Sequence, residues 1–152
     1  MTDVNDTLPA VTVKDSAGND VALGALKGPF VLYFYPKADT PGCTNEAKDF
    51  TELQGEFAKA GAIVYGMSKD KPAKLAKFAD KYGLKVTLLS DEESDAIERM
   101  GAWVEKSMYG KKYMGTFRKT FLIDGDGKIV KVFDKVNVAE HADEVLEAFG
   151  EK

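Results

Sequence analysis

Two unbroken apolar runs, Phe30–Tyr35 and Ala62–Met67, constrain the fold of this chain more than any other feature. Strands buried on both faces are typical of such runs. The segment between them, Thr44–Lys59, has the spacing of an amphipathic helix that ends near Gly61. A strand–helix–strand order implies two parallel strands joined by a right-handed crossover. The apolar positions of the helix recur every three or four residues: Ala47, Phe50, Leu53 and Phe57.

Further elements extend this unit on both sides. Val11–Val13 and Val21–Leu23 flank a turn-rich segment and predict an N-terminal hairpin. After the central unit, the patterns predict these elements in turn: a helix over Pro72–Tyr82, a strand over Val86–Leu89, a helix over Asp91–Met100, a less regular stretch, a hairpin of Arg118–Ile123 with Lys128–Phe133, and a helix over Ala139–Phe149. This order predicts one domain spanning 1–152. Its expected fold is thioredoxin-like α/β, a mixed central sheet flanked by helices with an N-terminal β-hairpin extension.

Charge and composition narrow the class of protein. The chain has 152 residues and a formal net charge of −4, so there is no basic excess to neutralise phosphates, and we expect no nucleic-acid partner. The acidic start, Met1–Asp6, lacks the apolar stretch of a signal peptide, and no run approaches the roughly 18 apolar residues of a membrane span. A single cysteine fits the reducing cytosol. We therefore expect a cytoplasmic protein with no membrane association.

That cysteine, Cys43, follows the first apolar run and a short loop, at the expected mouth of a helix. A thiol with a pKa of ~8.5 is only about 3% ionised at pH 7, and lowering that pKa to ~6 takes about 3.4 kcal/mol. The end of a helix typically supplies about 0.3–1 kcal/mol. A reactive thiol at this position therefore needs another cation. The alternative is that Cys43 is an inert, buried side chain, as lone cysteines often are.

The residues around Cys43 resemble a known family. Pro36-x-x-x-Thr40-x-x-Cys43 is similar to the active-site motif of the peroxiredoxins, and the longer stretch Tyr33–Glu46 resembles the bacterioferritin comigratory protein, or peroxiredoxin Q, branch. Other matching segments follow in the expected order: Gly66–Asp70, Lys77–Leu84, Leu88–Asp91 and Arg118–Asp124. The resemblance implies an antioxidant, thiol-dependent peroxidase for hydrogen peroxide and organic hydroperoxides, an oxidoreductase with no metal or organic cofactor.

The resemblance also implies the site residues. Cys43 is the expected nucleophile, and Arg118 the cation that donates to both thiolate and peroxide. Thr40 is expected to hydrogen-bond the peroxide, Pro36 to shape a dry pocket, and Glu46 to orient Arg118. Each has a structural alternative. Thr40 can have no role beyond a turn or a helix cap. Arg118 can be an ordinary charge at a strand end, and Glu46 an ordinary capping residue in the first turn of the helix.

The chain departs from the branch at one position. Many members carry a resolving cysteine where this chain has Lys48, and others carry it on the helix that corresponds to Pro72–Tyr82, which has none. The resemblance thus implies a one-cysteine enzyme whose Cys43 sulfenic acid awaits an external thiol, such as thioredoxin or glutaredoxin with glutathione. We further expect a monomer, and a first helix that need not unwind during turnover. Whether Lys48 is natural or replaces a cysteine stays open.

Two rival functions use the same fold. A thiol–disulfide oxidoreductase generally needs Cys-x-x-Cys, and Thr40 occupies the earlier position of that pair. A non-catalytic peroxide sensor or binding module would consume one peroxide per protein.

Elsewhere, Asp124–Lys128 superficially resembles a calcium loop but is expected to be a hairpin turn. His141 is expected to be exposed, and the aromatic residues before Arg118 either line the pocket or simply pack: Trp103, Tyr109 and Tyr113.

Overall fold

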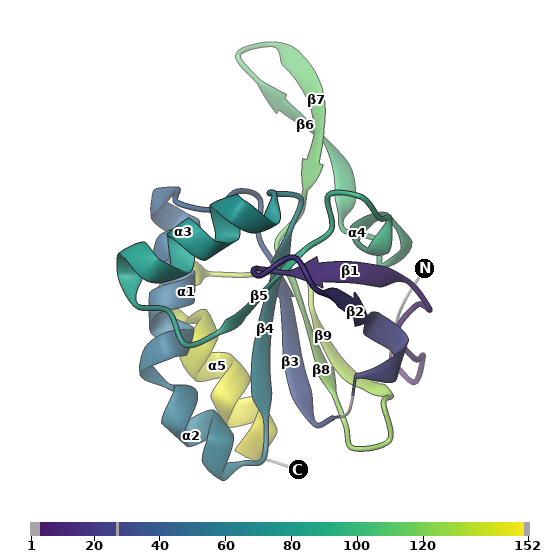
Figure 1. Cartoon of the computed structure of the whole chain (residues 1–152), viewed down its shortest axis with the longest axis vertical. Helices are drawn as coiled ribbons and strands as arrows, with labels where there is room; N and C mark the ends of the chain where they lie inside the picture. The colour runs from purple at the N-terminus through teal and green to yellow at the C-terminus, as the bar shows by residue number, and fades with distance from the viewer. Residues whose placement is uncertain (1–3, 27, 151–152) are drawn as a thin grey trace.

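The computed structural model describes residues 4–26 and 28–150 and contains one large mixed sheet (Figure 1). Its strands are β1 (Thr12–Asp15), β2 (Asp20–Ala22), β3 (Phe30–Phe34), β4 (Ile63–Ser68), β5 (Thr87–Ser90), β8 (Lys119–Ile123) and β9 (Ile129–Phe133). They lie side by side in the order β2-β1-β5-β4-β3-β8-β9. The pairs β3–β4 and β4–β5 are parallel, and the other pairs are antiparallel. The predicted thioredoxin-like arrangement is confirmed, and the N-terminal hairpin joins the sheet through β5.

Helices cover both faces of this sheet. Figure 1 shows α1 (Pro41–Glu52), α2 (Gln54–Lys59), α3 (Pro72–Tyr82) and α5 (Val138–Gly150) on one side, and the 3-10 turn η1 (Leu23–Ala25) with α4 (Ala96–Arg99) on the other. With helices on both faces, the sheet separates two apolar layers. Within the described residues, no helix is long and apolar enough to cross a membrane.

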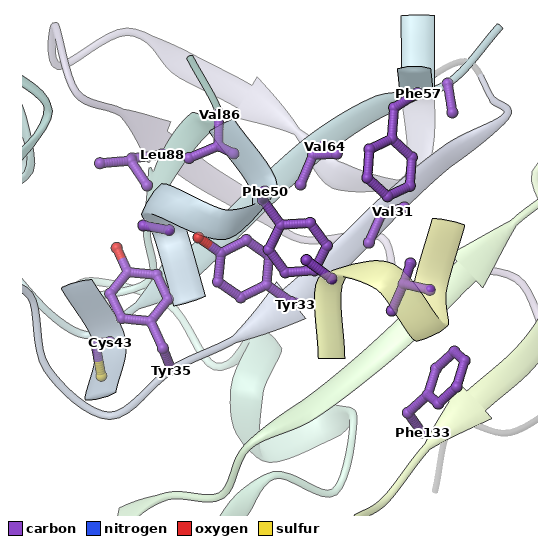
Figure 2. Close-up of a cluster of buried hydrophobic side chains, with 14 of the residues drawn as sticks. Val31, Tyr33, Tyr35, Cys43, Phe50, Phe57, Val64, Val86, Leu88 and Phe133 are labelled. Carbon is purple, nitrogen blue, oxygen red and sulfur yellow. The ribbon is translucent and has the colours of Figure 1, made fainter. Parts of the chain in front are cut away.

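The central strand β3 supplies side chains to both layers because successive residues of a strand point to opposite faces. Val31 and Tyr33 enter the layer under α1 and α5, whereas Leu32 and Phe34 enter the layer under α4. Tyr33 stacks on Phe50 of α1, with ring centroids 4.7 Å apart. Figure 2 shows this pair and places Cys43 at the edge of the same layer, beside Tyr35. The aromatic stack thus fixes α1, which carries the cysteine, against the sheet.

The first helix differs from its prediction at both ends. It begins at Pro41 rather than at Thr44, because proline suits the first helical position, where its missing N–H has no intrahelical partner. Cys43 therefore lies inside the first turn. The helical run is interrupted at Leu53, whose dihedrals leave the helical region, and α2 follows it. The expected helix over Asp91–Met100 is also shorter and spans only Ala96–Arg99.

The stretch predicted to be less regular is a two-stranded ribbon of β6 (Trp103–Met108) and β7 (Lys111–Thr116). It projects from the body of the molecule (Figure 1). Most residues toward the tip of this ribbon are exposed and need no alternation of apolar and polar types, which explains why the pattern missed it. Trp103 packs partly against the core, whereas Tyr109 is 98% exposed and Tyr113 is 44% exposed.

His141 is buried in α5 with 1% exposure, so the expectation that it is exposed was wrong. It shares a 2.7 Å hydrogen bond with Thr120 of β8, and its ring meets Phe50 and Phe133 edge-on. Acidic residues precede and follow it in the sequence, but the helix turns those residues outward. Burial, together with the positive charge of Arg118, lowers the pKa of His141 to about 4.

This buried histidine predicts an acid-sensitive fold. The unfolded chain gains a proton at its histidine below pH ~6.5, whereas the folded chain gains it only near pH 4, so stability falls as pH drops through this window. Relative to His141→Gln, the native protein should lose about 3 kcal/mol of unfolding free energy between pH 7 and 4. Urea unfolding at several pH values measures this difference. Parallel pH profiles for the two proteins would contradict the prediction.

Candidate active site

The cysteine lies at the start of α1, after a loop that leaves the carboxyl end of β3. Thr40 is the N-cap residue, and its carbonyl accepts the first helical hydrogen bond from Thr44 at 2.8 Å. Its hydroxyl makes no capping bond and donates instead to the carbonyl of Lys37 at 2.7 Å. The first-turn N–H groups lack partners within their own helix, and they form the positive end of the helix dipole. Cys43 lies in this first turn, close to that positive end.

Arg118 connects the cysteine to a buried carboxylate. Its Nη2 lies 3.2 Å from the Cys43 Sγ, and its Nη1 donates to Glu46 Oε1 at 2.8 Å. Cys43 and Glu46 are 2% and 1% exposed, whereas the side chain of Arg118 is 23% exposed. Arg118 immediately precedes β8 instead of lying within the predicted strand. The structure therefore brings Cys43, Glu46 and Arg118 into one contact.

The contact with Arg118 would favour a charged sulfur. Two unit charges 3.2 Å apart interact by on the order of 5 kcal/mol at an effective dielectric constant of about 20. Solvent at the half-buried guanidinium, the competing carboxylate of Glu46 and the burial of the sulfur all reduce this figure. The geometry thus places a cation in contact with Cys43.

The carboxyl group of Glu46 has an unusual environment. Burial raises its pKa to about 7, although the charge of Arg118 and the hydrogen bond from it act in the opposite direction. Near neutral pH both the charged and the neutral form of this carboxyl are therefore populated. When Glu46 is neutral, it carries no negative charge to offset the attraction between Arg118 and a charged sulfur.

The loop before α1 is held by contacts from the α3 region. The Ala38 N–H donates to Asp70 Oδ2 at 2.7 Å. Asp39 has a positive φ of 61°, which is uncommon for a non-glycine residue, and its carboxylate accepts from the Tyr82 hydroxyl at 2.6 Å. Pro36 and Thr40, on either side of these anchors, are half-buried. The structure therefore places both predicted residues in the anchored loop that leads into α1.

Lys48 lies on the exposed side of α1, and its Nζ is 5.4 Å from the centre of the Tyr82 ring. A groove of about 630 Å³ runs along this side of the helix and reaches Gly42. Cys43 itself does not line this groove. Lys48 thus shares a groove with Gly42, the residue before Cys43.

Sequence reasoning missed three residues around this site: Gly42, Asp70 and Lys106. Gly42 lies under the guanidinium, because a Cβ there would be 2.9 Å from Arg118 Nη2. Lys106 of β6 is half-buried, and burial followed by the charge of Arg118 lowers its pKa. Gly42 and Asp70 lie in the matching segments Tyr33–Glu46 and Gly66–Asp70, which were the available signals for them. Lys106 carried no local signal, because its interactions are made across the fold.

Gly42→Ala is expected to change activity and stability in opposite directions. The new methyl group displaces the guanidinium from Cys43, so the rate of peroxide reduction should fall about tenfold. Alanine is the better helix former by about 1 kcal/mol, so the unfolding free energy should stay level or rise. Peroxide-consumption kinetics and urea unfolding measure the two effects.

Gly55→Ala is the matched control for this variant. It makes the same substitution in α2, where an added Cβ has no neighbour within 4 Å among the described residues. We expect it to gain stability without losing activity. Equal activity in the Gly42→Ala and Gly55→Ala proteins would show that the space under the guanidinium is unimportant.

The chain is similar to known proteins along almost its whole length. The sequence profile of the AhpC/TSA family matches residues 4–132. Peroxiredoxin Bcp of Escherichia coli is 49% identical over 142 residues, which cover 93% of this chain and 91% of the relative. Peroxiredoxin Bcp of Bacillus subtilis is 41% identical over 146 residues, covering 95% and 93%. The solved structure of the Xanthomonas campestris bacterioferritin comigratory protein, studied for alkyl peroxide reduction, has a TM-score of 0.88 at 41% identity and covers 98% of each chain.

Proposed function

Since this chain belongs to the AhpC/TSA family and is a thiol-dependent peroxidase, we propose that Cys43 is its nucleophile. The thiolate attacks one oxygen of the O–O bond and takes it as a sulfenic acid, while the other oxygen leaves as an alkoxide or hydroxide and gains a proton. The cysteine is oxidised by two electrons and the peroxide is reduced by two. The 3.2 Å contact between Arg118 and the Cys43 sulfur carries this proposal.

We assign each neighbouring residue a separate role in this reaction. Arg118 stabilises the thiolate and the charge that develops along the O–O bond. Thr40 accepts a hydrogen bond from the peroxide hydroxyl, since its own proton is committed to the carbonyl of Lys37. Glu46 orients the guanidinium through its 2.8 Å hydrogen bond, and Pro36 shapes the loop without adding an N–H donor.

Turnover then requires an external thiol, because Cys43 is the only cysteine. A first thiol condenses with the sulfenic acid, releasing water and forming a mixed disulfide, and a second thiol releases Cys43 and leaves as a disulfide. Thioredoxin and glutaredoxin with glutathione are the candidate reductants. We propose that the thiol approaches along the groove beside Lys48, which reaches Gly42, the residue before Cys43.

We also propose the setting in which the enzyme works. The lone thiol suits the cytoplasm, where cysteines stay reduced. The net charge of −4 gives no support to a nucleic-acid partner, and we propose none. We expect one domain, a monomer, and activity on organic hydroperoxides as well as hydrogen peroxide, in keeping with the alkyl peroxide reduction of the Xanthomonas campestris relative.

The decisive experiment counts peroxide molecules consumed per protein in excess dithiothreitol. Catalysis consumes many, far faster than dithiothreitol alone, whereas a sensor whose sulfenic acid is closed to the added thiol would consume one. Without reductant, a single peroxide should convert Cys43 into a sulfenic acid that dimedone traps, as mass spectrometry can record. Repeating the assay with thioredoxin and with glutaredoxin plus glutathione identifies the reductant. Consumption of one peroxide in every case would refute the catalytic proposal.

Oxidation is expected to leave α1 folded. There is no second cysteine that the sulfur must reach, so residues 44–50 have no reason to unwind. Amide hydrogen exchange of the reduced and the peroxide-treated protein should show equal protection across this segment. A loss of protection on oxidation would contradict this expectation.

A further inference from the structure

A single peptide group links Thr40 to a carboxylate outside the residues assigned above. The peptide between Lys37 and Ala38 donates its N–H to Asp70 Oδ2 at 2.7 Å and accepts the Thr40 hydroxyl on its C=O, also at 2.7 Å. Because a peptide group is planar and rigid, fixing one end fixes the direction of the other. The orientation of the Thr40 hydroxyl is thus coupled to Asp70 through one rigid unit.

Asp70 is firmly held at the carboxyl ends of two strands. Its side chain is 10% exposed. The Ser68 hydroxyl donates to the same Oδ2 at 2.8 Å, and the Ser90 hydroxyl donates to the backbone carbonyl of Asp70 at 2.6 Å. Lys74 Nζ lies 3.4 Å from the other carboxylate oxygen. Asp70 therefore ties the loop to the ends of β4 and β5 through hydrogen bonds with Ala38, Ser68 and Ser90.

We propose that Asp70 is a positioning residue for peroxide attack and acts through Thr40. Its negative charge fixes and polarises the Lys37–Ala38 peptide, which makes the carbonyl a stronger acceptor. The proton of Thr40 is thereby held away from the substrate, and the lone pairs of its oxygen remain free to accept the peroxide hydroxyl. The inference rests on the proposed role of Thr40.

The test separates peroxide attack from the general reactivity of the thiol. Second-order rate constants for Cys43 are measured with hydrogen peroxide and with iodoacetamide, which alkylates the thiolate without needing Thr40. Asp70→Ala should slow the peroxide reaction about 10- to 100-fold and leave alkylation within about twofold. Asp80→Ala, which removes the same charge from the exposed side of α3, should change neither rate. A parallel fall in both rates for Asp70→Ala would overturn the proposal.

A conservative variant and a double-mutant cycle sharpen the result. Asp70→Asn keeps one acceptor oxygen but loses the charge, so it should recover only part of the peroxide rate lost in Asp70→Ala. It also provides the test if the alanine variant does not fold. In a Thr40→Val background, Asp70→Ala should change the peroxide rate less than about twofold. An equal effect in both backgrounds would overturn the link to Thr40 and leave the proposed function intact. If Thr40→Val itself has no effect, the proposed role of Thr40 fails and this inference falls with it.

Discussion

Peroxide consumption by Cys43→Ser is expected to fall to the rate of dithiothreitol alone. A serine hydroxyl is not ionised near neutral pH and its oxygen is a far poorer nucleophile, so the helix end and Arg118 have no anion to stabilise. Since enzymes typically accelerate reactions by about 10⁶-fold or more, nearly all of that enhancement should disappear. A peroxide assay in excess dithiothreitol measures it, and dimedone labelling should vanish in the same variant.

The matched control for Cys43→Ser is Thr44→Ser. It introduces a serine at the next position of the same helix turn, where the side chain is also buried. Thr44→Ser should keep catalytic peroxide consumption, and both variants should keep their circular dichroism spectra. Substantial catalysis by the Cys43→Ser protein would remove the cysteine from the proposed mechanism.

Arg118→Ala is expected to slow peroxide attack by about 10²–10³-fold, the usual cost of losing one donor that stabilises developing charge. The guanidinium lies 3.2 Å from the sulfur, so its loss should also lower the thiolate fraction and slow alkylation by iodoacetamide. Stopped-flow kinetics and a pH titration of the thiolate absorbance record the two effects. An unchanged titration would exclude Arg118 from stabilising the thiolate.

Two further variants separate catalysis from folding. Arg99→Ala removes the other arginine of the chain, which is about half exposed on α4, and should leave the peroxide rate unchanged. Arg118→Ala with Glu46→Gln removes the carboxylate that would otherwise stay buried without its partner. This double variant should regain stability but not activity. Recovery of the peroxide rate in the double variant would mean that the single substitution acts through misfolding.

Much of the fold could be predicted from local patterns. The apolar run before Cys43 and the helical spacing after it determined the strand–helix–strand unit, because burial on one or two faces leaves a periodic trace in the sequence. The end of α3 could be predicted in the same way, because Gly83 adopts the left-handed conformation that commonly ends a helix. The β6–β7 ribbon left no such trace, since most residues toward its tip are exposed.

The site likewise has features that the local sequence reveals and features that depend on packing between elements. By itself, the sequence determined the chemical identities: a lone cysteine at a helix start, a threonine and a proline in the preceding loop, and a distant arginine matched by resemblance. Only the tertiary structure decided the distances, since Arg118 and Cys43 are 75 positions apart and meet because β8 pairs with β3. It also decided that His141 is buried and that Asp70 reaches the Ala38 amide. These outcomes depend on how separate elements pack, and a contact between elements leaves no periodic signal within either of them.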